Sequence, residues 1–413
     1  MAHRTLAQRK QRSQFVIALA IVLLVFINRK QRRHRNFLSR SSLLPNPSEG
    51  TPWQALYAAN DDRAYIVTMG VGVAVFQKIL QSGFADTWNS FPIPRNDTRS
   101  VVHPRLGKRS LDAAGALGLI LHYLNSTMAD FSLQQIFALT PAVESRYRNW
   151  GLCILQATLR CMKDAAIAWP SRNRCEKYAD MIKRRHPLVT DAIGFVDGCH
   201  LPVATSSDLD IQNAFYNGWC SAHFTSNLFV FAPDGTIIHA TLNAPGSWHD
   251  AVVARDLYHA LLTKTENPFY VIGDTAFPTN KALEGKIRTP PKSNFNSWPN
   301  DMVQCYDMIK FFEQLVSARQ AAEWGMRCLQ GSFGRLRMPM PAGAGLDSVY
   351  RYRLLEVCSR LHNVRTRCEG INQIKTVYEG LWKSSGVYWD IGEMLFKDIR
   401  RNDRIRRYYN FVP

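Results

Sequence analysis

Two short apolar runs, each followed by an aspartate, most constrain how this chain can fold. The first is Phe-Val-Asp-Gly at residues 195–198, and the second is Val-Ile-Gly-Asp at residues 271–274. An apolar run that ends in a carboxylate is typical of a buried strand that brings a charged residue to its exposed end. We therefore predict that Asp197 and Asp274 lie at strand ends of one rigid sheet.

Two further strands are predicted between these runs, at residues 227–232 and 236–242. The Asp-Gly pair at residues 234–235 joins them and is a strong hairpin signal. An amphipathic helix is expected from Gly246 to about Leu262. The predicted order is thus strand, strand, strand, helix, strand.

This arrangement suits a divalent metal, because Mg²⁺ prefers hard oxygen ligands such as carboxylates. A third carboxylate is needed, and our candidate is Glu323, which lies 49 residues after Asp274 (323 − 274) in a stretch that reads as helix. The intervening segment offers three competing acids: Asp301, Asp307 and Glu313.

Five short motifs follow one another in this part of the chain. They are residues 196–200 (Val-Asp-Gly-Cys-His), 245–250 (Pro-Gly-Ser-Trp-His-Asp), 272–278 (Ile-Gly-Asp-Thr-Ala-Phe-Pro), the pair Arg319 and Glu323, and 333–336 (Phe-Gly-Arg-Leu). In order and spacing they resemble the PIF/Harbinger-type transposases, members of the DDE endonuclease superfamily. The resemblance covers residues 193–336.

The resemblance implies an α/β fold, with an RNase H-like mixed sheet, flanking helices and a preceding all-α region of helix-turn-helix type. It implies that Asp197, Asp274 and Glu323 are catalytic and bind Mg²⁺ or Mn²⁺. The expected activity is cleavage of DNA phosphodiester bonds at transposon ends, followed by strand transfer. A nuclear location, a Myb-like DNA-binding partner protein and a homo-oligomer are further expectations.

Three residues are candidates for a supporting role at this site: His249, Asp250 and Arg319. Asp250 has an alternative explanation, since Ser247 and Asp250 have the spacing of a helix capping box. Arg319 also has one, because a residue four positions before Glu323 can form an ordinary helix ion pair. As a site residue, Arg319 would contact phosphate or a metal-bound carboxylate.

Charge points to a polyanionic partner. Lys and Arg number 51 against 33 Asp and Glu, a net charge of +18, which favours nucleic acid or a membrane surface. The nine cysteines include no C-x-x-C pair, which fits a reducing compartment better than disulfides or a zinc site.

A hydrophobic stretch at residues 15–27 is flanked by basic clusters. Its 13 residues are fewer than the roughly 20 of a transmembrane helix, so a membrane partner is not favoured. The alternatives are a signal-anchor, a buried helix and an N-terminus that is untypical of related proteins.

Three helices are predicted at about residues 112–125, 131–137 and 140–162, with the short middle one expected of a helix-turn-helix module. Exposed Arg146, Arg148 and Asn149 on the long helix would then contact DNA. The alternative is a helical bundle that supports the catalytic domain.

We divide the chain into residues 1–110 (basic, with the hydrophobic stretch and a linker), 111–190 (helical), 191–345 (catalytic) and 346–413 (a closing helix and a basic, aromatic tail). Two classes of function remain. The first is a metal-dependent transposase, and the second is a domesticated or inactive relative that binds DNA or protein. The presence of all three candidate carboxylates favours the first.

Overall fold

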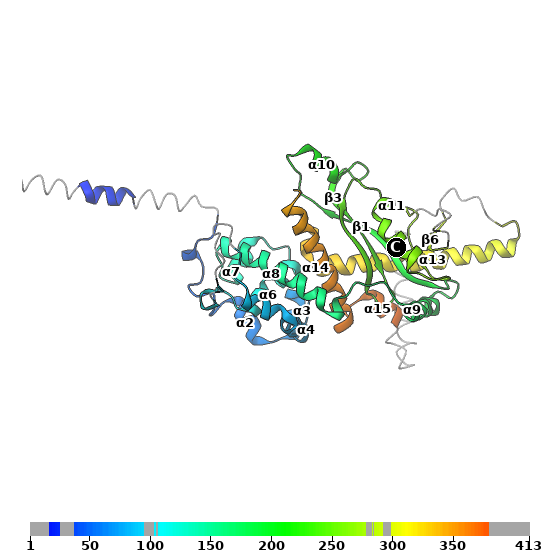
Figure 1. Ribbon diagram of the computed structural model, residues 1–413, viewed down its shortest axis with the longest axis horizontal. Coiled ribbons are helices and arrows are strands. Elements are labelled where there is room, and N and C mark those ends of the chain that lie inside the picture. Colours follow the sequence, from blue (N-terminus) through cyan, green and yellow to red (C-terminus); the bar gives the residue numbers. More distant parts are fainter. Residues whose placement is uncertain are drawn as a thin grey trace, which may run out of the picture.

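The computed structural model describes residues 16–24, 37–94, 103–104, 106–277, 283, 285–291 and 299–379 (Figure 1). A block of helices and a sheet covered by helices lie side by side, with helix α14 (Leu346–Cys368) between them. The predicted basic and aromatic tail beyond residue 379, and the basic cluster at residues 29–35, lie outside the described residues.

The N-terminal part of the described chain is all-α. Its helices are α2 (Pro52–Ala59), α3 (Asp62–Met69), α4 (Val73–Ile79), α5 (Ala85–Ser90), α6 (Ala113–Asn125), α7 (Asp130–Ile136) and α8 (Pro141–Cys161). Helix α6 is buried on every side, because its neighbours in the block surround an almost wholly apolar sequence. Helices on both sides of residue 110 share this core.

The sheet has the order β4–β3–β1–β5–β6, and its central strands are the predicted ones. They are β1 (Ala192–Pro202), β3 (Ala222–Phe231), β4 (Ile237–Pro245), β5 (Tyr270–Ile272) and β6 (Ile287–Arg288); β2 (Tyr216–Asn217) pairs with the start of β3. Strand β3 is antiparallel to β1 and β4, whereas β5 is parallel to β1 and β6 to β5. This mixed sheet confirms the predicted α/β, RNase H-like fold.

Helices cover both faces of the sheet. One face packs against α13 (Met302–Ser332) and α14, and its core is continuous with that of the helical block. The other face packs against α12 (Arg255–Thr263) and part of α9 (Arg172–Arg185). The remaining helices are short: α10 (Leu209–Phe215), α11 (Asp250–Val253) and α15 (Gln373–Glu379). The single helix predicted from Gly246 to Leu262 is therefore two helices, which meet at Ala254.

Two arginines stack on the ring of Tyr123 in α6, and one of them, Arg335, joins the helical block to the part of the chain that follows α13. The guanidinium carbons of Arg148 and Arg335 lie 4.6 and 4.1 Å from the centroid of the Tyr123 ring. Both arginines approach Asp130, at 2.9 and 3.6 Å. Cation–π contacts of this kind are stronger when they are shielded from water, as here. Arg335 belongs to the Phe-Gly-Arg-Leu motif, so that motif serves to fasten the two parts together.

The prediction that Arg148 is exposed is wrong. Its side chain is only 12% exposed and forms ion pairs with Asp130 and Glu144, so it is not presented on the surface of the helix as predicted. Arg146 is half-buried and bonds to the Ala142 carbonyl within its own helix, whereas Asn149 is exposed. Helix α8 packs between α6 and α14, which favours the supporting bundle over a DNA-reading helix.

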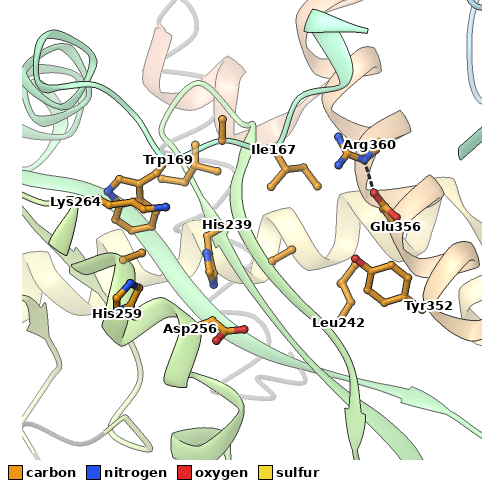
Figure 2. Close-up of a pocket in the computed structure, with 14 residues that line it drawn as sticks. Ile167, Trp169, His239, Leu242, Asp256, His259, Lys264, Tyr352, Glu356 and Arg360 are labelled. Atoms are coloured by element: carbon orange, nitrogen blue, oxygen red, sulfur yellow. Dashed lines mark hydrogen bonds and ion pairs between the residues drawn. The ribbon is translucent and has the colours of Figure 1, made fainter. Parts of the chain in front are cut away.

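A cavity of about 590 Å³ runs along β4, the outer strand of the sheet (Figure 2). Residues of α12 line one wall and residues of α14, including Tyr352, Glu356 and Arg360, line the other. None of the three candidate carboxylates lines this cavity.

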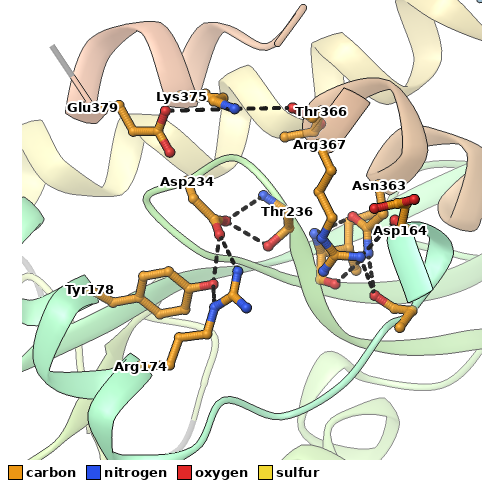
Figure 3. A network of polar contacts seen from close by, with 12 residues as sticks. Asp164, Arg174, Tyr178, Asp234, Thr236, Asn363, Thr366, Arg367, Lys375 and Glu379 are labelled. Atoms are coloured by element: carbon orange, nitrogen blue, oxygen red, sulfur yellow. Dashed lines mark hydrogen bonds and ion pairs between the residues drawn. The ribbon is translucent and has the colours of Figure 1, made fainter. Parts of the chain in front are cut away.

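A polar network fixes the predicted hairpin between β3 and β4 (Figure 3). Asp234 accepts hydrogen bonds from Thr236, from Tyr178 at 2.7 Å and from Arg174 at 3.1 Å. Asn363 of α14 pairs with the backbone N–H and carbonyl of Ile237, at 2.7 and 2.9 Å. The hairpin turn is thus held by α9 on one side and by α14 on the other.

Residues 16–24 form a helix whose side chains are all exposed, so these nine residues (24 − 16 + 1) do not form the buried helix considered above. Within the described part of the chain, no single helix combines the length and hydropathy of a membrane span; the bent pair Asp62–Met69 and Val73–Ser90 does so by length and composition only.

Glu356 links α8 to α14, and we predict that its removal destabilises the fold. It accepts hydrogen bonds from Gln156 at 2.7 Å, Arg160 at 2.6 Å and Arg360 at 2.8 Å. Burial alone would raise the pKa of Glu356, but these bonds lower it to about 2. Its stabilising effect is therefore present above the ordinary pKa of about 4.5 and is lost as the pH falls toward 2.

Glu356→Ala should lower the free energy of unfolding by about 2 kcal/mol at neutral pH, because the partly buried donors of Gln156 and Arg360 lose their acceptor, whereas the exposed Arg160 can bond to water. Urea denaturation measures this. The matched control is Glu313→Ala on α13, which breaks an exposed pair with Lys310 and should cost less than about 1 kcal/mol. Equal losses in the two variants would contradict the role given to Glu356.

Candidate active site

The parallel pairing of β1 and β5 brings Asp197 and Asp274 to equivalent positions. Phe195 is the last residue of β1 that pairs with β5, and its partner is Ile272. Each aspartate lies two residues further along (197 − 195 and 274 − 272). Paired parallel strands are about 4.8 Å apart, and residues in register point to the same face. The two carboxylates therefore leave neighbouring strands on one face of the sheet.

Asp274 follows the end of β5 as predicted, but Asp197 lies within β1 rather than at its end. Strand β1 continues to Pro202 because its second half pairs with β3. The side of β1 that faces β5 is nevertheless open beyond Phe195, since β5 stops at Ile272. At Asp197, β1 is thus paired with β3 on one side and unpaired on the side of β5.

The face that carries the two aspartates is the one covered by α13. Side chains alternate along a strand, and Phe195 and Cys199, on either side of Asp197, belong to the same core as Ala322 and Leu329 of α13. Gln330 of α13 donates a hydrogen bond to the Cys199 thiol sulfur at 3.2 Å. Helix α13 therefore lies directly over the aspartates.

The charges around Asp197 show which groups surround it. Burial raises the pKa of Asp197 to about 6. A hydrogen bond from the Gly198 amide, at 2.9 Å, and the positive charge of Arg319 oppose this rise, whereas the carboxylates of Asp274 and Glu323 add to it. All three charged neighbours are thus close enough to act on Asp197.

Local backbone contacts hold Asp274 in place. Its Oδ1 atom accepts hydrogen bonds from the Thr275 amide at 2.6 Å and the Thr275 hydroxyl at 3.3 Å. Gly273 lets the backbone pass close to β1, since a Cβ there would lie 2.9 Å from the Val196 Cγ1 atom. Thr275 is not among the predicted site residues, although a hydroxyl directly after a strand-end aspartate is a usable sequence signal.

Glu323 is held by the arginine one helical turn before it. The Arg319 guanidinium lies 3.2 Å from the Glu323 Oε1 atom, and the Glu323 side chain is 44% exposed. The ion pair considered as an alternative is therefore present. Among the described residues, no three His, Cys, Asp or Glu side chains lie close enough together to hold a metal ion.

The residues present fit a divalent metal by their chemistry. Two half-buried carboxylates on neighbouring strands supply hard oxygen ligands, and the third can come from Glu323, whose side chain is 44% exposed and paired with Arg319. Burial raises the pKa of Asp197 most, and the repulsion from Asp274 and Glu323 that adds to this rise is what cation binding would relieve. Metal ligation by Asp197, Asp274 and Glu323 stays a prediction.

Asp250, another predicted supporting residue, lies on the opposite face of β1. A Cβ on Gly198 would be 3.2 Å from the Asp250 Oδ1 atom, so Asp250 faces Gly198 and not Asp197. The capping-box prediction is wrong, because the N-cap of α11 is His249, whose Nδ1 atom accepts from the Ala251 amide at 3.2 Å. Ser247 bonds instead, through its amide, to the Ala214 carbonyl.

Residues 196–363, from Val196 in β1 to Asn363 in α14, match the family model described as DDE superfamily endonuclease. Neither the curated proteins nor the solved structures gave a match. The matched segment contains Asp197, Asp274 and Glu323, and over this segment the chain is similar to the DDE superfamily endonucleases.

Proposed function

We propose that this protein is a metal-dependent DNA endonuclease of the PIF/Harbinger transposase type. It would cut phosphodiester bonds at transposon ends and transfer the freed strand to target DNA. The observation that carries the proposal is the register of Asp197 and Asp274 on the face covered by the helix of Glu323. The family match supports the nuclease class.

Each side chain has a defined role in this proposal. Asp197 and Asp274 provide fixed carboxylates for Mg²⁺ or Mn²⁺, and Glu323 provides a third. Bound divalent ions would activate a water or a DNA 3′-hydroxyl and stabilise the leaving oxygen. Because no side chain acts as a nucleophile, the protein's contribution is to position charges. Arg319, once Glu323 turns away from it, is available to bind a phosphate oxygen.

DNA is the substrate that this class of domain implies, and the net charge of +18 fits it. We further propose a nuclear location and a homo-oligomer. We also propose cooperation with a Myb-like DNA-binding protein, because Arg146 and Arg148, the arginines predicted to contact DNA, are not exposed in the helical block. Imaging of the tagged full chain tests the nuclear location, which an exclusively cytoplasmic signal would contradict.

Nicking of DNA by the purified protein tests the activity. The substrate is a plasmid that carries the sequences flanking the gene, supplied with Mg²⁺ or Mn²⁺. Asp274→Asn and Glu323→Gln should each reduce nicking by more than about 100-fold, because even groups that only hydrogen-bond to metal ligands often cost 10- to 100-fold.

The matched control is Glu313→Gln, which changes an exposed acid on the same helix as Glu323 and should leave nicking unchanged. Loss of nicking in all three variants alike would argue against the assigned ligands. DNA binding without nicking by the wild-type protein, with or without the Myb-like partner, would favour the domesticated binder.

A further inference from the structure

Trp219 is the most exposed large apolar side chain among the described residues, at 96% exposure. It lies at the tip of the hairpin formed by β2 and the start of β3, between Asn217 and Ala222. An indole ring in water forgoes one of the largest burial energies of any side chain. Tryptophan, which combines a large apolar ring with a polar N–H, is enriched at binding interfaces.

The tip that carries Trp219 is held rigidly. The Asn217 Oδ1 atom accepts hydrogen bonds from the amides of Trp219 at 3.0 Å and Cys220 at 3.2 Å. The Asn217 Nδ2 atom donates to the Gly246 carbonyl at 2.9 Å, which ties the hairpin to the end of β4. The backbone at Trp219 is therefore held in a fixed turn, so that a ligand would have to order only the indole side chain.

Two more aromatic side chains with exposed surface accompany it. Tyr216, 42% exposed, contacts His223 across the hairpin, with ring centroids 5.2 Å apart. Trp248, 47% exposed, follows the Gly246 that Asn217 binds. Stacking surfaces are thus concentrated at this end of the sheet.

The charge of the region restricts what the hairpin can hold. Residues 186–254 contain no Lys or Arg, and the nearby helix α10 begins with Asp208 and Asp210. The hairpin and the segments next to it in sequence therefore contribute no cationic side chain of their own for ion pairs with phosphates. A neutral, planar group that stacks on indole fits, and nucleobases stack on aromatic side chains irrespective of sequence.

The hairpin extends from the candidate active site. Phe229 of β3 is paired with Asp197, and Ala222 lies seven residues away (229 − 222). At about 3.4 Å per residue this is roughly 24 Å, or about seven base pairs of B-DNA at 3.4 Å each. DNA bound at Asp197 can thus reach the hairpin.

We propose that Trp219 stacks on an unpaired nucleobase of bound DNA, some seven nucleotides from the cleavage position. This inference rests on the proposed function for the identity of the ligand. Tyr216 and Trp248 provide further stacking surface beside it, and Asn217 is the positioning residue that fixes the turn.

Fluorescence anisotropy of the full chain with labelled single-stranded DNA of about 30 nucleotides, longer than a typical single-strand footprint, tests the proposal. The buffer contains EDTA, so that binding is measured without cleavage. Trp219→Ala should weaken binding by roughly 5- to 100-fold, the usual loss for one stacked base. Trp219→Phe should retain most of the affinity. The slope of affinity against salt should stay unchanged in both, because no phosphate contact is lost.

Tyr306→Ala is the matched control, since Tyr306 is an exposed aromatic residue on α13 and should not affect binding. Equal affinities of the wild type and Trp219→Ala, or no binding of this DNA by either, overturn the proposal. So does a change of molecular mass in Trp219→Ala by light scattering without loss of DNA affinity, which would assign the tryptophan to a contact between copies of the chain.

The result is separable from that of the nicking experiment. Tryptophan-dependent binding by a protein that does not nick leaves this inference standing and removes the nuclease. Nicking that depends on Asp274, with DNA affinity unaffected by Trp219→Ala, does the reverse.

Discussion

The parallel pairing of β1 with β5 is the constraint on which the candidate active site depends. These strands are far apart in the sequence, and only their register places Asp197 beside Asp274. The close approach at Gly273 and the bonds from Thr275 then fix the second carboxylate. Backbone amides bond to both carboxylates and the strands fix their positions. The protein therefore holds two like charges close together, whereas unrestrained side chains would move apart.

The third carboxylate is controlled differently. Helix α13 is anchored over the sheet by its buried small residues and by close contact of Gly325 with the Phe231 ring. Glu323 lies on its half-exposed side and is paired with Arg319. Two carboxylates are thus fixed by backbone contacts, whereas the third is held by its ion pair with Arg319. In the proposed function, a metal ion and a phosphate would compete with this ion pair for Glu323 and Arg319.

The helical block contributes stability to this arrangement. Its apolar core is continuous with the face of the sheet beneath α13 and α14, and Tyr123, Arg148 and Arg335 join the parts through polar contacts. Helix α8 packs against α6 and α14 and carries the ion-paired Arg148, so it is not free to enter a DNA groove. We therefore expect substrate to be bound mainly by surfaces of the catalytic domain and by residues outside the described part.

Local sequence signals predicted much of this. Apolar runs and the Asp234-Gly235 turn located the central strands and the hairpin, and the spacing of motifs indicated the mixed α/β fold. Contacts between residues far apart in the sequence could not be predicted from such local signals. Nothing local to Arg148 reveals that Asp130 and Tyr123 surround it, and the pairing with β3 that carries β1 past Asp197 depends on a distant strand. The exposure of Trp219 likewise depends on the tertiary fold.

The most direct test of the central claim is to locate Mn²⁺ in crystals of the protein by anomalous scattering. We predict a peak bound by the carboxylates of Asp197 and Asp274, with Glu323 turned from Arg319 toward it, and no peak in Asp197→Asn. Mn²⁺ absent from this position in the wild type, or present equally in the variant, would contradict the account.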